Sequence, residues 1–188
     1  MTSTLLDRPA TVAEAGPATI GPAAGARTAR PLLTGARCTK GHLNDPRLAY
    51  CATCGISLLL APRTPVLGSR PPLGVLVLDD GMTCPLVNDL VLGRAPEADL
   101  EVAAGQADPI RVTGPGVSRV HARMVLEGWE VTVADAGSTN GTFLWDPAQR
   151  SWSRLALGER AVLRPGAALA LGGRQLRYHT YRDSYRDR

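Results

Sequence analysis

One stretch decides the fold of this chain, Val117 to Leu144, which reads V-S-R-V-H-A-R-M-V-L-E-G-W-E-V-T-V-A-D-A-G-S-T-N-G-T-F-L. Two runs within it predict strands. His121–Glu127 alternates roughly between apolar and polar side chains, and Trp129–Asp135 alternates cleanly, with the tryptophan and two valines on one face. Glu127-Gly128 between the runs predicts a tight turn, so we expect the two strands to pair antiparallel.

Polar clusters lie at both ends of this hairpin. Ser118-Arg119-Val120-His121 precedes the first strand, and Ser138-Thr139-Asn140-Gly141 follows the second. Because a hairpin returns the chain to the end of the sheet where it started, Ser118 becomes a neighbour of Thr139 and Asn140. Two hydroxyls and an amide on loops at the end of a sheet predict a polar recognition surface.

The flanking sequence predicts many more short strands. Leu90–Leu92 is a buried strand that ends at Gly93-Arg94. Further strand-like runs, with turns every eight to twelve residues, are Gly74–Asp79, Thr83–Val87, Leu100–Val102, Ile110–Val112, the hairpin Trp145–Leu155, Arg160–Leu163, Ala167–Leu171 and Gln175–Tyr178. This spacing predicts an all-β fold of the β-sandwich type.

Charge is distributed unevenly along the 188 residues, whose net charge is +4. Residues 73–180 contain ten arginines against twelve carboxylates, whereas residues 1–72 contain eight basic residues against three acidic ones. A nucleic-acid-binding domain usually has its positive charge on the folded body, and here the predicted body is slightly acidic. Twenty arginines against one lysine indicate a GC-rich coding bias and hence a bacterial source.

Composition divides the chain into five parts. Residues 1–37 are rich in Ala, Gly, Pro and Thr and are predicted to be disordered. A small module, residues 38–58, is followed by a proline-rich linker, residues 59–72. The sandwich spans residues 73–180, and residues 181–188 form a flexible tail. Neither a secretion signal nor an apolar run long enough to span a membrane is visible, so we expect a cytoplasmic protein with reduced cysteines.

Four residues of the small module predict a zinc site. Cys51-x-x-Cys54-Gly is half of a zinc knuckle, and Cys38 lies thirteen positions before it, a separation typical of short zinc ribbons. A second Cys-x-x-Cys would need a cysteine at Gly41, so His42 is the candidate fourth ligand of a structural Zn²⁺. A ribbon that has lost its metal, or a redox-active pair of cysteines, are the alternatives.

The motifs Gly93-Arg94, Ser118-x-x-His121 and Thr139-Asn140-Gly141, in this order, resemble the forkhead-associated (FHA) domain, a phosphothreonine-binding β-sandwich of two antiparallel sheets. The resemblance covers roughly Leu73 to Tyr178 and includes all the signature positions of that family. It implies the following roles: Arg94, Ser118 and Thr139 hold the phosphate with Arg119 as an auxiliary, Asn140 grips the peptide main chain, and Gly93, His121 and Gly141 are structural.

The chemistry of these residues fits that role. Phosphothreonine has up to two negative charges and three strong acceptor oxygens, and the planar guanidinium of Arg94 matches phosphate in a bidentate manner. Hydroxyls of Ser118 and Thr139 add neutral donors. Ser118, His121 and Asp135 could instead suggest a hydrolase, but no nucleophile-elbow motif surrounds the serine, so we expect no enzyme.

The sequence thus predicts a non-enzymatic adaptor that binds Thr-phosphorylated proteins or peptides downstream of Ser/Thr protein kinases. Its own phosphorylated N-terminal segment is a further candidate partner, whereas a membrane or nucleic acid is not expected. The competing hypothesis is a nucleic-acid-binding regulator that uses the basic, zinc-bearing N-terminal part. A third is a sandwich that binds partners without phosphate.

Overall fold

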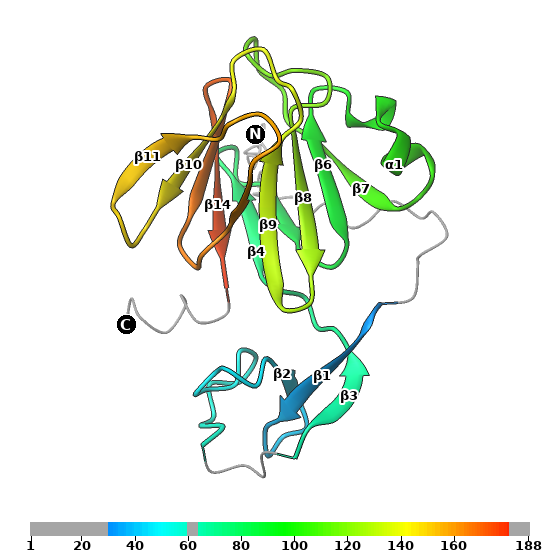
Figure 1. Cartoon of the computed structure of the whole chain (residues 1–188), viewed down its shortest axis with the longest axis vertical. Helices are drawn as coiled ribbons and strands as arrows, with labels where there is room; N and C mark the ends of the chain where they lie inside the picture. The colour runs from blue at the N-terminus through cyan, green and yellow to red at the C-terminus, as the bar shows by residue number, and fades with distance from the viewer. Residues whose placement is uncertain (1–29, 60–63, 181–188) are drawn as a thin grey trace, which may run out of the picture.

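Two bodies make up the computed structural model of this chain, a larger β-sandwich and a smaller module at one end of it (Figure 1). The structure describes residues 30–59 and 64–180. The disorder predicted for residues 1–29 and the tail predicted at residues 181–188 lie outside the described residues. Within the described ranges, no helix is long and apolar enough to cross a membrane.

One sheet of the sandwich contains five strands in the order β12-β9-β8-β6-β7. Their bounds are β6 Asp89–Gly93, β7 Ala107–Arg111, β8 Ala122–Glu127, β9 Glu130–Asp135 and β12 Arg160–Val162. The predicted hairpin is confirmed, since β8 and β9 pair antiparallel along their whole length. Its turn lies one residue later than predicted, at Gly128 and Trp129, where Gly128 has φ 59°. Glycine adopts this left-handed conformation without a steric penalty.

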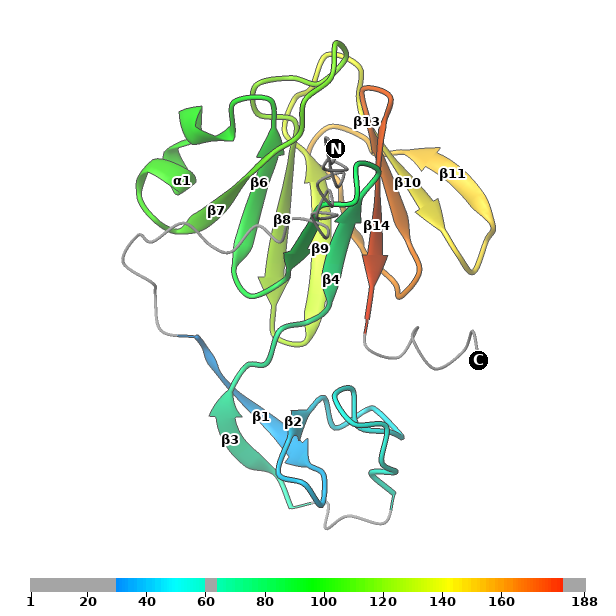
Figure 2. The ribbon, with the colours of Figure 1, turned by 180° about the vertical axis from the view of Figure 1, so that it is seen from behind.

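The other sheet contains six antiparallel strands in the order β11-β10-β13-β14-β4-β5. The bounds are β4 Val75–Leu78, β5 Thr83–Pro85, β10 Thr142–Asp146, β11 Ser151–Arg154, β13 Ala168–Leu171 and β14 Arg174–His179. The view from behind shows β4 beside β14, with β10 and β11 at the far edge (Figure 2). The predicted all-β sandwich is confirmed.

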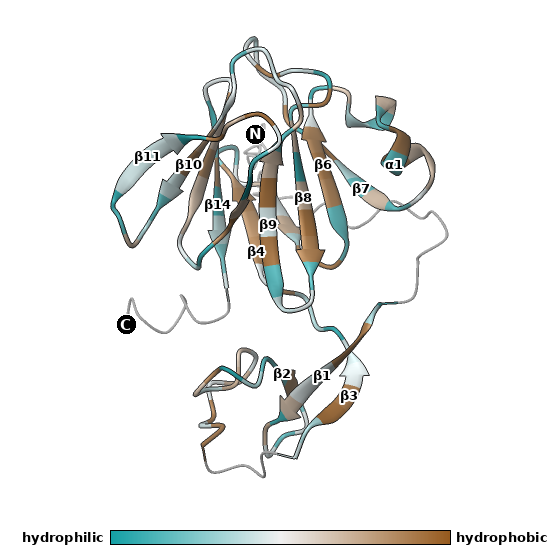
Figure 3. Cartoon of the chain, viewed as in Figure 1, coloured by the Kyte–Doolittle hydropathy of each residue, from teal (hydrophilic) through white to brown (hydrophobic). Residues whose placement is uncertain are grey.

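Apolar side chains from both sheets meet in one core between them. Period-2 alternation places one set of residues of each strand inward, and Leu76, Leu92, Leu169 and Leu176 are all fully buried. Figure 3 shows the apolar stretches along β4, β6 and β8. Burying one such leucine stabilises the fold by roughly 1.5–3 kcal/mol, so the core fixes which loops meet at each end of the sandwich.

One predicted strand, Leu100–Val102, is wrong, because this segment is the short helix α1, Leu100–Ala103. Asp99 caps the helix by accepting a hydrogen bond from the Glu101 N–H at 2.9 Å, and Leu100 is exposed. A 3₁₀ turn, η1 Pro96–Ala98, precedes it. The 3₁₀ turn and α1 connect the end of β6 to the start of β7, so that β7 pairs parallel to β6. Among the described strands this is the one parallel pair, in a sandwich that was predicted to be antiparallel.

The smaller module also contains a sheet, with the order β2-β1-β3 and the bounds β1 Leu32–Arg37, β2 Leu43–Asn44 and β3 Val66–Ser69. The prediction of disorder up to Arg37 is therefore wrong for β1, and the predicted linker at 59–72 contains β3. β1 and β3 pair antiparallel from Leu32↔Ser69 to Gly35↔Val66. Neither strand alternates by itself, and each is stabilised by hydrogen bonds to a partner far away in sequence.

Contacts fix the module to the turn of the β8–β9 hairpin. Arg70, just after β3, is buried, and its guanidinium donates hydrogen bonds to the carbonyls of Leu126 and Val87. The Trp129 Nε1–H donates to the Thr34 carbonyl at 3.2 Å. Trp129 was predicted to share the apolar face of β9, and its position at the turn instead directs it toward the module. The connection is packed rather than a free spacer.

Candidate functional site

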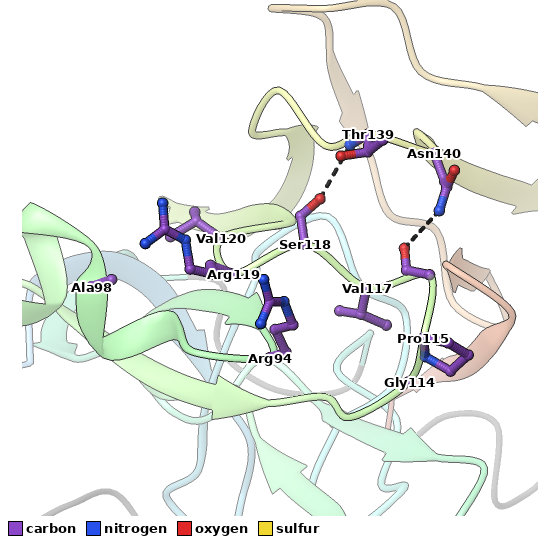
Figure 4. A pocket seen from close by; sticks show the side chains of 11 residues that line it. Arg94, Ala98, Gly114, Pro115, Val117, Ser118, Arg119, Val120, Thr139 and Asn140 are labelled. Atoms are coloured by element: carbon purple, nitrogen blue, oxygen red, sulfur yellow. Dashed lines mark hydrogen bonds between the residues drawn. The ribbon is translucent and has the colours of Figure 1, made fainter.

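A groove of about 810 Å³ lies at the loop end of the sandwich. It is lined by the end of β6 and by the two loops that flank the β8–β9 hairpin, residues 114–120 and 136–141. All five residues predicted to bind phosphopeptide line it, namely Arg94, Ser118, Arg119, Thr139 and Asn140. Figure 4 shows the two arginine side chains beside each other near Ser118. The hairpin thus brings together residues that are separated in sequence, as predicted.

Arg94 is positioned by backbone contacts where β6 ends. Its N–H donates to the Ser118 carbonyl at 2.9 Å, and the Ala95 N–H donates to the Arg119 carbonyl at 3.1 Å. A Cβ at Gly93 would lie 2.0 Å from the Arg119 carbonyl oxygen, so only glycine permits this approach of the two segments. Within the described residues, 30–59 and 64–180, no carboxylate lies within ion-pair distance of Arg94 or Arg119. Both charges are therefore available to a ligand.

Hydrogen bonds join the two loops across the groove. The Thr139 N–H donates to Ser118 Oγ at 3.1 Å, and Asn140 Nδ2 donates to the Gly116 carbonyl at 3.0 Å (Figure 4). Because Ser118 Oγ accepts the bond from Thr139, its own proton is free to point into the groove. Asn140 retains an acceptor oxygen and a second N–H, which is the pair of groups needed to grip a peptide main chain.

His121 holds these loops from below. The fully buried ring accepts a hydrogen bond from the Ser118 N–H at Nδ1 (3.0 Å), while Nε2 lies 3.2 Å from the Gly141 carbonyl. The proton must therefore be on Nε2. Burial lowers the pKa of His121, against smaller opposing effects of the Gly141 carbonyl and Asp135. With Nδ1 occupied by a backbone donor, the ring cannot act as a base toward Ser118 Oγ, which argues against a hydrolase.

Asp135 also holds a loop of the groove in place. From the sequence, Asp135 was considered only as part of a hydrolase triad with Ser118 and His121. Its carboxylate accepts from the N–H groups of Gly137 and Ser138 and from the hydroxyls of Ser138 and Thr142, at 2.5–3.0 Å. Burial opposes ionisation, but the bonds from Ser138 and Thr142 lower the pKa of Asp135 overall. The Asp-x-x-Ser spacing, which is typical of turns closed by a side chain, is the sequence signal that could have predicted this role.

Glycines allow a third loop to approach. A Cβ at Gly172, which has φ 55°, would lie 2.1 Å from the Gly116 carbonyl carbon. At Gly141, with φ 79°, a Cβ would lie 2.4 Å from Nε of Arg154. Gly141 was predicted as structural and Gly172 only as a turn residue. The close contacts of Gly116, Gly172 and Arg154 were not predicted, because they depend on approach in three dimensions.

The four predicted metal ligands also come together. Cys38 Sγ lies 3.5 Å from His42 Nδ1 and 3.8 Å from Cys54 Sγ, and Cys51 Sγ lies 3.7 Å from His42 Nδ1. All four ligand atoms lie within 4.8 Å of one another. Tetrahedral zinc, with bonds of about 2.3 Å to sulfur and about 2.0–2.1 Å to nitrogen, separates its ligand atoms by roughly 3.5–3.8 Å. The cluster therefore fits a metal ion of this size.

The surroundings of one cysteine of the cluster, Cys51, favour its thiolate form. Burial raises the pKa of Cys51, but the backbone N–H groups of Cys54 and Thr53 outweigh it, so that the pKa falls to about 6. Asn44, which is buried, ties the two halves of the cluster: its Nδ2 donates to the His42 carbonyl at 2.7 Å, and its Oδ1 accepts from the Ala52 N–H at 2.8 Å. The sequence did not reveal this residue.

Comparison with known proteins finds one matching family model and several similar solved structures. Residues 90–172 match the family model of the FHA domain. A structure from a study of phosphothreonine-dependent FHA domain interactions has 28% identity and a TM-score of 0.41, covering 56% of this chain and 93% of that one. The FhaA FHA domain, complexed with the intracellular domain of Rv3910, has 26% identity and a TM-score of 0.41 over 56% and 98% of the two chains. An FHA domain of an Arabidopsis thaliana hypothetical protein has 20% identity and a TM-score of 0.47 over 60% and 92%. No curated protein matches.

Proposed function

Taking residues 90–172 as an FHA domain, we propose that this protein is a non-enzymatic adaptor that binds phosphothreonine peptides in the groove at the end of the sandwich. The observation that carries the proposal is the pairing of two unneutralised arginines with two hydroxyls and an amide on that groove. Arg94 provides a planar donor fork for the phosphate, Ser118 and Thr139 provide neutral donors, and Arg119 adds charge from the rim. Asn140 grips the peptide main chain.

The wider role follows from this chemistry. Phosphothreonine is made by Ser/Thr protein kinases, so we place the protein downstream of such kinases, in the cytoplasm of a bacterium. The partner is a Thr-phosphorylated protein, and the occupied nitrogen of His121 supports binding rather than catalysis.

Arg94→Ala is the direct test. Charge-assisted hydrogen bonds are worth about 1.5–3 kcal/mol each, so we expect calorimetry with a phosphothreonine peptide library to show at least a tenfold loss of affinity. Arg94→Lys should restore binding only in part, because an ammonium cannot form the bidentate fork. The melting temperature should stay unchanged, since the side chain is exposed.

Arg160→Ala is the matched control, because Arg160 is exposed on β12, away from the groove. Wild-type affinity in Arg94→Ala would overturn the assignment, as would equal binding of phosphorylated and unphosphorylated peptides. The latter result would favour a sandwich that binds partners without phosphate.

We further propose that Cys38, His42, Cys51 and Cys54 hold one structural Zn²⁺. The support is the spacing of the four ligand atoms, which matches a closed tetrahedral site. Metal analysis of the purified protein should find about one zinc per chain. Free and reactive thiols at all three cysteines of a metal-free protein would reject the site.

No observation favours the nucleic-acid hypothesis. Arg47, on the side of the module that faces the sandwich, is engaged by Asp45 and Glu130, and the Arg37 Nη1–H donates to the Gly41 carbonyl at 2.6 Å. Arg70 is buried. These arginines are used within the protein and do not form an open basic surface.

A further inference from the structure

The outer face of the six-stranded sheet is apolar along β4, β10 and β13, although only the inner face packs on the core, whereas β14 presents Gln175, Arg177 and His179 outward. β4 places Leu76 and Leu78 inward and both its valines outward, and β13 places Leu169 and Leu171 inward and both its alanines outward. A sheet with one solvated face normally alternates between apolar and polar residues. An uninterrupted apolar strand is typical of burial on both faces, so the outer side of β4 and β13 has the composition of a surface that is covered.

Aromatic side chains gather at one end of this face. The chain has eight aromatic residues, and three of them, Phe143 and Trp145 of β10 and Trp152 of β11, lie outward here. Phe143 is 37% exposed and Trp152 is 43% exposed. The two tryptophans are direct cross-strand partners, with ring centroids 5.8 Å apart and planes tilted by 54°. Tryptophan is one of the residue types enriched among binding hot spots, and Trp152 remains exposed here.

Among the strands that the structure describes, the same end of the sheet has an unpaired edge. β11 is the outermost strand of the sheet, and all four of its residues are exposed. The Leu155 N–H donates to the Thr142 carbonyl at 2.9 Å. Since hydrogen-bonded and non-hydrogen-bonded pairs alternate in an antiparallel ladder, Trp152 and Arg154 direct their backbone N–H and C=O groups away from β10. These groups are available to an added strand.

The charge of the face is positive. Arg154 lies opposite Phe143, and Arg177 lies opposite Ala168, so both belong to the outer side. No carboxylate occupies an outward position of β4, β10, β11, β13 or β14 in the register of these strands. In the part of the chain that the structure describes, Arg150, Arg154 and Arg177 form no ion pair.

We propose that the outer face at β10 and β11 is a second, phosphate-independent docking surface for an extended acidic segment of a partner protein. The segment adds to the free edge of β11 as a strand, as peptides do in β-augmentation. Its apolar side chains cover Phe143 and the tryptophan pair, and its carboxylates neutralise Arg154 and Arg177.

Charge and shape favour an acidic peptide segment over two other occupants, a second copy of this chain and single-stranded nucleic acid. A second copy paired through β11 would bring the Arg150 and Arg154 side chains of both copies together without a carboxylate between them. Single-stranded nucleic acid needs separate ring faces on which bases stack, whereas Trp145 and Trp152 pack against each other. A free strand edge matches a polypeptide backbone.

The proposal is tested by nuclear magnetic resonance on the full-length, ¹⁵N-labelled protein. The probe is an unphosphorylated, end-blocked seven-residue peptide, Val-Thr-Glu-Thr-Val-Thr-Glu, whose valines and glutamates occupy odd positions and therefore lie on the same face of an extended strand. We expect the amide signals of Ser151–Arg154 and the indole N–H signals of Trp145 and Trp152 to shift on titration. A peptide with lysine in place of each glutamate should cause no shift, and added salt should weaken binding of the glutamate peptide.

Variants separate the contributions. Trp152→Ala should weaken peptide binding at least tenfold, and Arg154→Gln should weaken it several-fold and reduce the salt dependence. Leu100→Ala is the control, because it removes an apolar side chain that is 85% exposed on α1, outside the proposed surface. Equal melting temperatures establish that each variant is folded.

Several results would overturn the proposal. These are an absence of shifts at β10 and β11, equal binding of the lysine peptide, or the same shifts produced by oligo-deoxythymidine. Shifts at these residues that follow protein concentration, with a dimer seen by light scattering, would assign the surface to a second copy. Binding of phosphothreonine peptides is measured separately, so failure of either proposal leaves the other standing.

Discussion

His121 joins two loops of the groove through its two ring nitrogens, and it can do so only when it is neutral. Burial holds its pKa below the ordinary value near 6.5, so the folded protein binds fewer protons than the unfolded chain once the pH falls below about 6.5. The stability that this residue contributes is therefore present above that pH and is lost toward the folded-state pKa.

We expect the free energy of unfolding to fall between pH 7 and pH 5, by at most about 1.4 kcal/mol per pH unit from this residue. Asp135 does not contribute in this window, because its pKa is lowered from the ordinary carboxyl value, so that the group is ionised in both the folded and the unfolded state there. Urea unfolding of the wild type and of His121→Gln, both saturated with zinc, measures the difference. The variant should show a shallower pH dependence, and parallel curves would contradict the assigned role.

At the scale of elements, the β8–β9 turn is the contact point between the metal module and the sandwich. The module should depend on its metal, since so small a sheet has little apolar core of its own. We therefore expect chelation to unfold residues 38–58 and to release the Trp129 indole from the Thr34 carbonyl. The core of the sandwich should persist, because its buried residues form a separate cluster.

Tryptophan fluorescence in the variant Trp145→Phe, Trp152→Phe isolates Trp129 as the reporter. Adding a chelator should shift its emission to longer wavelength, while the amide nuclear magnetic resonance signals of β13, whose Leu169 and Leu171 are fully buried, stay unchanged. Adding zinc back should reverse the shift. Emission that does not respond to the chelator would show that the module holds its place without metal.

The sequence predicts the elements that local signals specify. The β8–β9 hairpin and β6 follow from alternation and from glycine at their ends, and they alone bring Arg94, Ser118 and Thr139 together. β1 and β3 could not be predicted, because neither has a period of its own and each requires the other. The helix α1 was also not predicted. The run Leu100–Val102 favours a strand by its composition, but the cap formed by Asp99 stabilises a helical turn there. Loop contacts such as Gly116 with Gly172 exist only once the sheets have packed.

At the scale of the whole molecule, the module and the groove lie at opposite ends of the β8–β9 hairpin, which limits self-binding by the N-terminal segment. Strand β8 has six residues and spans about 20 Å. Thr34 lies within β1, and Thr28 is two residues from the first described residue, a distance of at most about 7 Å. Neither can reach the groove of its own chain.

The chain between Thr11 and the first described residue is long enough for a phosphorylated Thr11 to reach the groove. Nineteen residues separate Thr11 from Arg30, and a random coil of that length spans about 24 Å on average. We predict that kinase treatment lowers the affinity of the full-length protein for an external phosphothreonine peptide, because the internal ligand has an effective concentration near millimolar. Calorimetry of Thr11→Ala should show restored affinity, whereas Thr28→Ala, the control, should remain inhibited. Equal affinities before and after phosphorylation would exclude self-binding.

The pairing of β1 with β3 makes the metal module a cassette, that is, a segment that could be removed or inserted as one piece. Its entry and exit lie side by side, because the Arg70 N–H donates to the Pro31 carbonyl at 2.9 Å. Joining Pro31 directly to Arg70 would remove the cassette without stretching the backbone on either side. For the same reason, recombination could move it as one piece into a surface turn of another protein, where the host chain would need to open by only the width of one strand pair.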